Sequence, residues 1–147
     1  MKLIYSKGLG ELCPSTTVPI PASHVDCMVC GQYDSLGLRF RTNGNSVEAL
    51  FQANSQWQGY AGFLHGGMIS TLLDAAMTHC LFSHGIEAMT ASLKVRFLEP
   101  VATSGELEIK ATLDERRRHV YLLNAELASS GRCLARAEAR FIRGRKS

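Results

Sequence analysis

A long apolar stretch behind two adjacent glycines is the feature that most limits how this chain can fold. After Gly66 and Gly67, apolar side chains recur at the three- and four-residue spacing of a helix face, and others extend that surface nearly all the way round. The residues concerned are Met68, Ile69, Leu72, Leu73, Ala75, Ala76, Met77, Cys80 and Leu81. A helix that is apolar on most sides must be covered on most sides, so we predict a buried helix that ends near His84-Gly85.

Two features of this helix suggest a chemical site. Asp74 is a lone carboxylate within the apolar stretch, and a buried charge is costly unless it is paired or used. At the other end, the two glycines leave backbone N–H groups open to close approach, and such a terminus suits an anion or an oxygen that becomes negative during reaction. The structural alternative is that hydroxyls at the same helical stripe, Ser70 and Thr78, simply satisfy the Asp74 carboxylate.

The spacing between these two features predicts a dimer. Gly66 and Asp74 are eight residues apart, which is roughly 12 Å along an α-helix and too far for both to touch one small carbonyl group. If both serve one site, the carboxylate must come from a second copy of the helix, packed antiparallel about a two-fold axis. We therefore expect an isologous homodimer with two sites at its interface, alone or within a dimer of dimers.

Strand-like alternation flanks the helix on both sides. The predicted strands cover residues 37–42 and 46–53 before it, joined by an Asn43-Gly44 hairpin turn, and residues 88–98, 106–114, 119–128 and 132–142 after it. This order favours an α+β fold in which an antiparallel sheet wraps around one long central helix. We expect the strands to bury their apolar residues against the helix, namely Val95, Phe97, Leu107, Ile109, Leu113 and Phe141.

Composition narrows the class of protein. At 147 residues and 46% hydrophobic, the chain fits one domain with a sizeable core, and a net charge of +3 does not indicate a nucleic-acid binder. Three of its four prolines fall within residues 1–26, which we expect to form an extended arm on a domain of residues 27–147. No apolar run is long enough for a membrane span or a signal peptide. Five cysteines indicate free thiols in a reducing compartment, and thus a cytoplasmic protein.

The pair Cys27-x-x-Cys30 is the one pattern typical of a metal site. His24 precedes it by three residues, so three zinc ligands are conceivable. No second pair follows, and the other cysteines are scattered. We therefore interpret the segment as a structural turn with buried thiols and expect neither a metal ion nor a cofactor.

Several motifs together resemble a known family. His65-Gly66-Gly67 is followed by an acid nine positions after the histidine, and a later strand closes on Glu99-Pro100. In this combination the chain resembles the hot-dog-fold acyl-CoA thioesterases, and the Cys27-x-x-Cys30-Gly31 segment is similar to a subgroup of the phenylacetic-acid-degradation (PaaI-like) branch. The resemblance covers roughly residues 27 to 142 and implies a hot-dog fold, hydrolysis of acyl thioesters and no cofactor.

The resemblance also implies roles for individual residues. Gly66 matches the residue whose N–H polarises the thioester carbonyl, and Asp74 matches the carboxylate that acts as nucleophile or general base across the dimer interface. Thr90 matches a hydroxyl residue that helps hold the attacking water. His65 matches a histidine that shapes the loop and contacts the thioester, although a purely structural hydrogen bond is an equal alternative.

Substrate contacts are expected around the same helix terminus and at one cationic run. Gly67 adjoins Gly66, and Gln58 is the candidate replacement for the Asn or Gln that the family carries at the position of Gly59. Cationic side chains suit the phosphates of coenzyme A, so the run Arg116-Arg117-Arg118 is a candidate for binding them, against the alternative of a solvated hairpin edge. The rival functions are a non-catalytic acyl-CoA-binding domain and a hot-dog dehydratase or hydratase.

Overall fold

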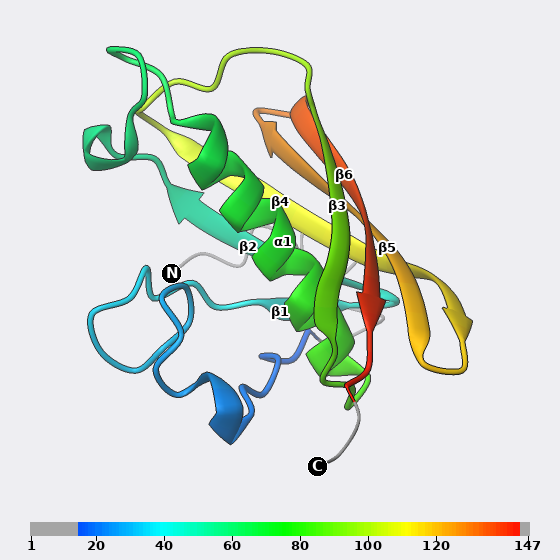
Figure 1. Cartoon of the computed structure of the whole chain (residues 1–147). Helices are drawn as coiled ribbons and strands as arrows, with labels where there is room; N and C mark the ends of the chain where they lie inside the picture. The colour runs from blue at the N-terminus through cyan, green and yellow to red at the C-terminus, as the bar shows by residue number, and fades with distance from the viewer. Residues whose placement is uncertain (1–14, 145–147) are drawn as a thin grey trace.

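The computed structural model describes residues 15–144, which form one sheet and one long helix (Figure 1). The elements are the short 3-10 helices η2 (Ala22–His24) and η3 (Ser55–Trp57), the helix α1 (Gly66–Ser83), and the strands β1 (Arg41–Asn43), β2 (Ser46–Gln52), β3 (Met89–Phe97), β4 (Glu106–Arg117), β5 (Val120–Ser129) and β6 (Arg132–Ile142). The strands are hydrogen-bonded in the order β1-β2-β4-β5-β6-β3, and every pair is antiparallel. This confirms the predicted α+β arrangement.

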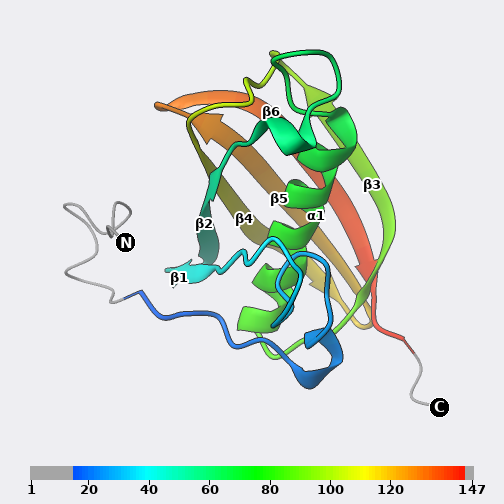
Figure 2. The ribbon, with the colours of Figure 1, turned by 90° about the vertical axis from the view of Figure 1, so that its left-hand side faces the viewer.

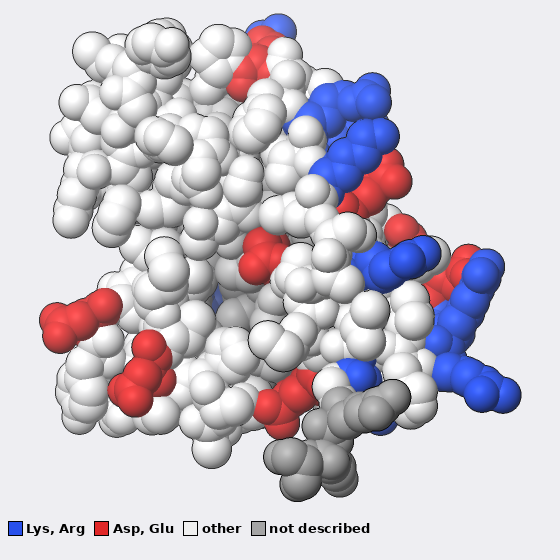
Figure 3. Space-filling view, viewed as in Figure 1, with Lys and Arg blue, Asp and Glu red and all other residues white. Residues whose placement is uncertain are grey.

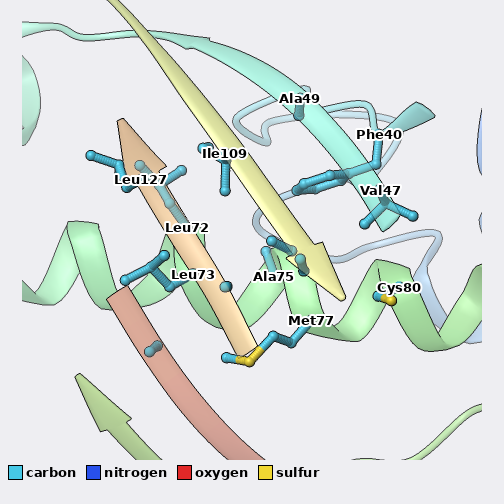
Figure 4. Close-up of a cluster of buried hydrophobic side chains, with 14 of the residues drawn as sticks. Phe40, Val47, Ala49, Leu72, Leu73, Ala75, Met77, Cys80, Ile109 and Leu127 are labelled. Carbon is cyan, nitrogen blue, oxygen red and sulfur yellow. The ribbon is translucent and has the colours of Figure 1, made fainter. Parts of the chain in front are cut away.

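The helix α1 is covered on two sides, as its apolar surface requires. The sheet curves around one side, where Leu72, Leu73 and Ala76 have no exposed surface and pack against strand residues such as Ile109 (Figure 4). The segment before β1 crosses the C-terminal half of α1 on the side away from the sheet (Figure 2), and its Phe40 ring stacks on the buried His79 ring at 4.6 Å. Only the polar stripe of α1 stays partly open.

Two strands differ from the predicted bounds by more than one residue. The first predicted strand, 37–42, is mostly irregular, because the backbone of this stretch bonds to the segment before it: Val18 N–H donates to Phe40 O, and Leu38 N–H donates to Val29 O. Only Arg41–Asn43 joins the sheet. The strand β4 continues to Arg117, three residues beyond the predicted end.

The strand β3 lies at one edge of the sheet and is poorly covered. Of the apolar residues expected in the core, Leu107, Ile109 and Phe141 are buried, and Val95 and Leu113 are half-buried. The prediction for Phe97 is wrong for the single chain, since 53% of its surface is exposed. Its strand has a neighbour on one side only, so the helix and sheet cannot enclose it.

The boundary between arm and domain stays a prediction. Residues 1–14 of the expected arm lie outside the described part, and in the remainder Val18 belongs to the core cluster. Within residues 15–144, no helix has the length and apolar character needed to cross a bilayer.

We expect Leu72→Ala to lower the free energy of unfolding by about 2–5 kcal/mol, because it leaves a cavity in a fully packed part of the core. Denaturant titration measures the loss. Ile142→Ala is the matched control on the exposed outer face, where truncation should change stability by less than about 1 kcal/mol. A Leu72→Ala protein as stable as the control would show that this helix face is not the packed one.

Candidate active site

His65 shapes the start of α1. It is the N-cap residue, and its Nδ1 accepts a hydrogen bond of 2.8 Å from Gly67 N–H. Met68 and Ile69 N–H both donate to the His65 carbonyl. Of the four backbone N–H groups in the first turn of α1, only that of Gly66 has no acceptor among the described residues. Because Nδ1 accepts this bond, the N–H of the ring is on Nε2, and His65 as a residue is exposed.

Two glycines leave little room around this histidine. A Cβ on Gly67 would lie 3.0 Å from His65 Nδ1, and a Cβ on Gly59 would lie 3.3 Å from the His65 Cα. A side chain at either position would require His65 to shift by a few tenths of an ångström. Gly59 therefore departs from the family pattern in a way that suits the observed orientation of His65.

Asp74 lies on the partly open stripe of α1 and is bound from β3. Thr90 Oγ1 donates a hydrogen bond of 2.7 Å to Asp74 Oδ1. Burial raises the pKa of the Asp74 carboxyl above its usual value, and the bond from Thr90 lowers it by less. The hydroxyls of Ser70 and Thr78 do not bind the Asp74 carboxylate. Ser70 donates to the main-chain carbonyl of Gly66, and Thr78 donates to the main-chain carbonyl of Asp74.

A β-bulge brings Thr90 to Asp74. In β3, Thr90 pairs with Phe141 and Ser92 with Arg140, so Ala91 is an extra residue. Phe141 is fully buried, so Thr90 faces the helix side of the sheet, as Phe97 does opposite the buried Ala135. Thr90 and Phe97 are seven residues apart, and strict alternation would place them on opposite faces.

Gly66 and Asp74 meet β3 at its two ends. A Cβ on Gly66 would lie 3.5 Å from the Phe97 ring at the end of the strand, whereas Asp74 meets Thr90 near its beginning. The two groups therefore belong to different places within one chain, as the helix spacing predicts.

The other predicted substrate contacts lie apart from Asp74. Gln58 Oε1 accepts a hydrogen bond of 3.1 Å from Gly62 N–H, so its amide closes the turn before α1. The Gly67 N–H is occupied by His65. Both residues stay near Gly66, where they shape the loop.

The cationic run lies at the opposite end of the sheet. Arg116 and Arg117 end β4, and Arg118 occupies the turn to β5 with φ 50°. Strand pairing joins this end to Ile142 and Met89, away from Phe97 and Gly66. Arg116 and Arg143 each lie 5.9 Å from the Tyr121 ring, and Arg117 pairs with Glu115. In Figure 3 the Lys and Arg side chains lie on the right, over the sheet, with Asp and Glu side chains among them, and the upper left is uncharged.

The cysteine pair forms a tight turn. Gly31 N–H donates to the Cys27 carbonyl at 2.8 Å, and Val29 N–H donates to Cys27 Sγ. Burial, with a hydrogen bond to Cys27, raises the pKa of the Cys30 thiol to about 12. Among the residues described, no three His, Cys, Asp or Glu side chains are grouped to hold a metal ion. The expectation of no bound zinc stays a prediction.

Comparison with known proteins links this geometry to one family. A family model described as the thioesterase superfamily matches residues 61–134, which are 74 of the 147 residues and include Gly66, Asp74 and Thr90. The mouse acyl-coenzyme A thioesterase THEM4 is 33% identical over 86 residues, covering 56% of this chain and 37% of its own length. This chain thus spans less than half the length of that curated relative.

Solved structures share the fold. A phenylacetic acid degradation-related protein from Ralstonia eutropha aligns with a TM-score of 0.67 and 26% identity, covering 84% of this chain and 91% of its own. A Streptococcus mutans protein bound to acetyl-CoA aligns with a TM-score of 0.66 and 21% identity, covering 69% and 83%. The hot-dog fold that the sequence motifs suggested is therefore confirmed.

We expect Thr90→Val to raise the pKa of Asp74 further, because the variant keeps the side-chain shape but loses the hydrogen bond that favours the charged carboxylate. NMR titration of the Asp74 carboxyl carbon measures the change. Thr90→Ser, which keeps a hydroxyl, should return the pKa towards that of the native protein. An identical titration in all three proteins would mean that Thr90 does not control this carboxylate.

Proposed function

Because this chain belongs to the thioesterase superfamily, we propose that it hydrolyses acyl-CoA thioesters to the free acid and coenzyme A. The observation that carries the proposal is the state of Asp74. It is the only Asp, Glu, Lys or Arg between Glu48 and Glu87, it is partly buried, and a hydroxyl from a second element holds it. A purely structural carboxylate would have both oxygens bonded within the protein, whereas only Oδ1 of Asp74 has a partner among the described residues, so Oδ2 on the partly open stripe is left for a water molecule.

The proposed reaction begins at Gly66. Its free N–H donates to the thioester carbonyl oxygen and stabilises the negative charge that develops there, a contribution of ~3–4 kcal/mol for one such donor. The partly positive N-terminus of α1 acts in the same direction. The Nε2–H of His65, an exposed residue, lies beside this position and supplies a second donor to the thioester.

Asp74 supplies the second half of the chemistry. As a general base it takes a proton from water, the water oxygen bonds to the carbonyl carbon, the C–S bond breaks, and the thiolate leaves and is protonated. As a nucleophile its oxygen attacks the carbonyl carbon directly, the C–S bond breaks, and the thiolate leaves and takes a proton from solvent. Water then hydrolyses the anhydride to the free acid and returns the Asp74 carboxylate. Thr90 holds the carboxylate, and with it the water, in both routes.

We propose that Asp74 acts on the substrate bound at Gly66 of the partner subunit. Within residues 15–144, no strand pairs with the outer edge of β3, and its inner apolar side chains stay open, with Leu93 37% and Phe97 53% exposed. Antiparallel pairing of two β3 edges about a two-fold axis covers these side chains and continues the sheet. It also sets each Asp74 against the opposite Gly66.

The same two-fold symmetry brings Arg116, Arg117 and Arg118 towards the substrate. In an antiparallel pair, the Arg116–Arg118 end of one subunit lies beside the Gly66 end of the other. The subunit that supplies Asp74 then also supplies cations near the substrate, and the phosphates of coenzyme A are the groups that would pair with them. We place the reaction in the cytoplasm, where the free thiols of Cys27, Cys30, Cys80 and Cys133 stay reduced.

We expect Asp74→Asn to lower kcat by about 10²-fold or more, since the amide keeps the shape of the carboxylate but neither attacks nor accepts a proton. Acyl-CoA affinity and the unfolding temperature should be kept, because burial disfavours the charge that is removed. In the native protein, activity should fall as pH drops through the raised pKa of Asp74, so this acid limb lies above the usual range of an aspartate. Native-rate hydrolysis by a folded Asp74→Asn protein would leave only a binding function for this site.

We expect a dimer or tetramer by light scattering, with sites that two chains share. Gly66→Pro removes the oxyanion donor at the first helical position, where proline is tolerated, and His65 already has an extended backbone with ψ 137°. Gly66→Pro and Asp74→Asn proteins should each be inactive alone. Mixed after subunit exchange, they should regain about one quarter of native activity, since half the dimers are mixed and each has one intact site of two. No recovery despite exchange would place the whole site in one chain.

A further inference from the structure

We propose that the cavity at the N-terminus of α1 receives the acyl chain of the substrate and that Phe97 determines which chain length fits. The cavity has a volume of about 570 Å³, within the range of ~300–1,000 Å³ that is usual for small-ligand pockets. This inference rests on the proposed function, because the acyl chain is the part of a thioester that extends from the carbonyl carbon.

The position of the cavity connects it to the reacting group. Gly66 forms part of its wall, together with Ile69 of the next helical turn and the end of β3. A thioester carbonyl bonded to Gly66 N–H therefore lies at the boundary of the cavity, where one of its two substituents can extend into it. The question is whether the acyl chain or the pantetheine arm does so.

The lining favours the acyl chain. Tyr60, Phe63 and Phe97 supply aromatic surface, and Ile69 and Leu98 supply aliphatic surface. The only ionisable carboxylate in the lining, Glu99, is paired with Arg132. A pantetheine arm carries amide and hydroxyl groups that lose hydrogen bonds in such surroundings, whereas a hydrocarbon chain loses none. Tyr60 and Phe63, which lie on the loop before α1 and are 89% and 45% exposed, also gain free energy when such a chain covers them.

The aromatic part of the wall is held in place. Gly59 N–H donates to the Phe63 carbonyl and Phe63 N–H donates to the Tyr60 carbonyl, each at 2.9 Å. The bond from Gly62 N–H to Gln58 Oε1 closes the same turn. Tyr60 and Phe63 therefore sit on a fixed loop, and Gln58 is a positioning residue for the cavity.

Phe97 stands where the cavity meets the reacting group. Its ring is 3.5 Å from the position of a Cβ on Gly66, and its strand faces the helix side of the sheet at this end. A larger ring at this position narrows the space immediately beyond the carbonyl carbon, and a smaller side chain widens it. The choice of acyl group should thus depend on the size of the side chain at position 97.

The test measures how chain-length preference depends on Phe97. The quantity is the ratio of kcat/KM for dodecanoyl-CoA to that for acetyl-CoA, which cancels any effect on the chemical step that both substrates share. Phe97→Trp should lower this ratio by about tenfold or more, the scale at which an apolar pocket rejects extra methylenes, and Phe97→Ala should raise it or leave it unchanged. Leu50→Ala, a half-buried residue of β2 near the sheet edge opposite to β3, is the control and should give the native ratio.

Binding measurements separate this inference from the proposed function. In an Asp74→Asn background, calorimetry gives the ratio of dissociation constants for the same two thioesters, and Phe97→Trp should shift it in the same direction. If the native protein hydrolyses neither substrate but the binding ratio shifts, the function fails and the acyl cavity stands. If Phe97→Trp weakens both thioesters equally while unfolding at the native temperature, the cavity holds the pantetheine arm and the inference is overturned.

Discussion

The rest of the molecule depends on the need to cover α1 on nearly every side. An isolated helix with apolar residues all round cannot face water, so the sheet curves over one side and residues 15–40 cross another. Hydrophobic burial of this kind is non-directional and does not by itself create a site. It does determine how the axis of α1 lies against β3, and this arrangement positions Gly66, Asp74 and Thr90.

Chemistry is confined to the places where this cover stops. Along the helix, the open stripe carries the hydroxyls of Ser70, Thr71 and Thr78, and all three are occupied by main-chain carbonyls. Asp74 is left as the one charged group, and its bond to Thr90 reaches outside the helix. At the N-terminus, the His65 cap takes one of the free donors and leaves another at Gly66. Both groups are thus polar atoms that the helix itself does not use.

Much of the fold could be predicted because it follows from local periodicity. The three-four spacing behind Gly66 identifies α1, and the period-two alternation identifies the four late strands, since both patterns are properties of consecutive residues. The separation of Gly66 from Asp74 needed only the helical rise. The strand prediction for residues 37–40 is wrong because their backbone groups bond to Val18 and Val29 in a preceding segment instead of to the sheet. No local pattern reveals such a pairing.

The remainder of the site could not be predicted, for reasons of register and environment. Nothing in the sequence shows that Phe97 lies on an edge strand, because strand order is a property of the whole sheet. The orientation of the His65 ring depends on Gly59 and Gly67, neither of which signals a contact by itself.

The bulge at Ala91 sets which residues of β3 face the helix. That assignment changes with the number of residues in the strand rather than with their identity. Loss of one residue there, with every side chain of the site still encoded, would turn Thr90 to the outer surface and detach it from Asp74. A short deletion at this point can therefore break the site without a substitution at any of its residues. For related chains, the spacing between the helix aspartate and the strand threonine carries information that residue identity alone does not.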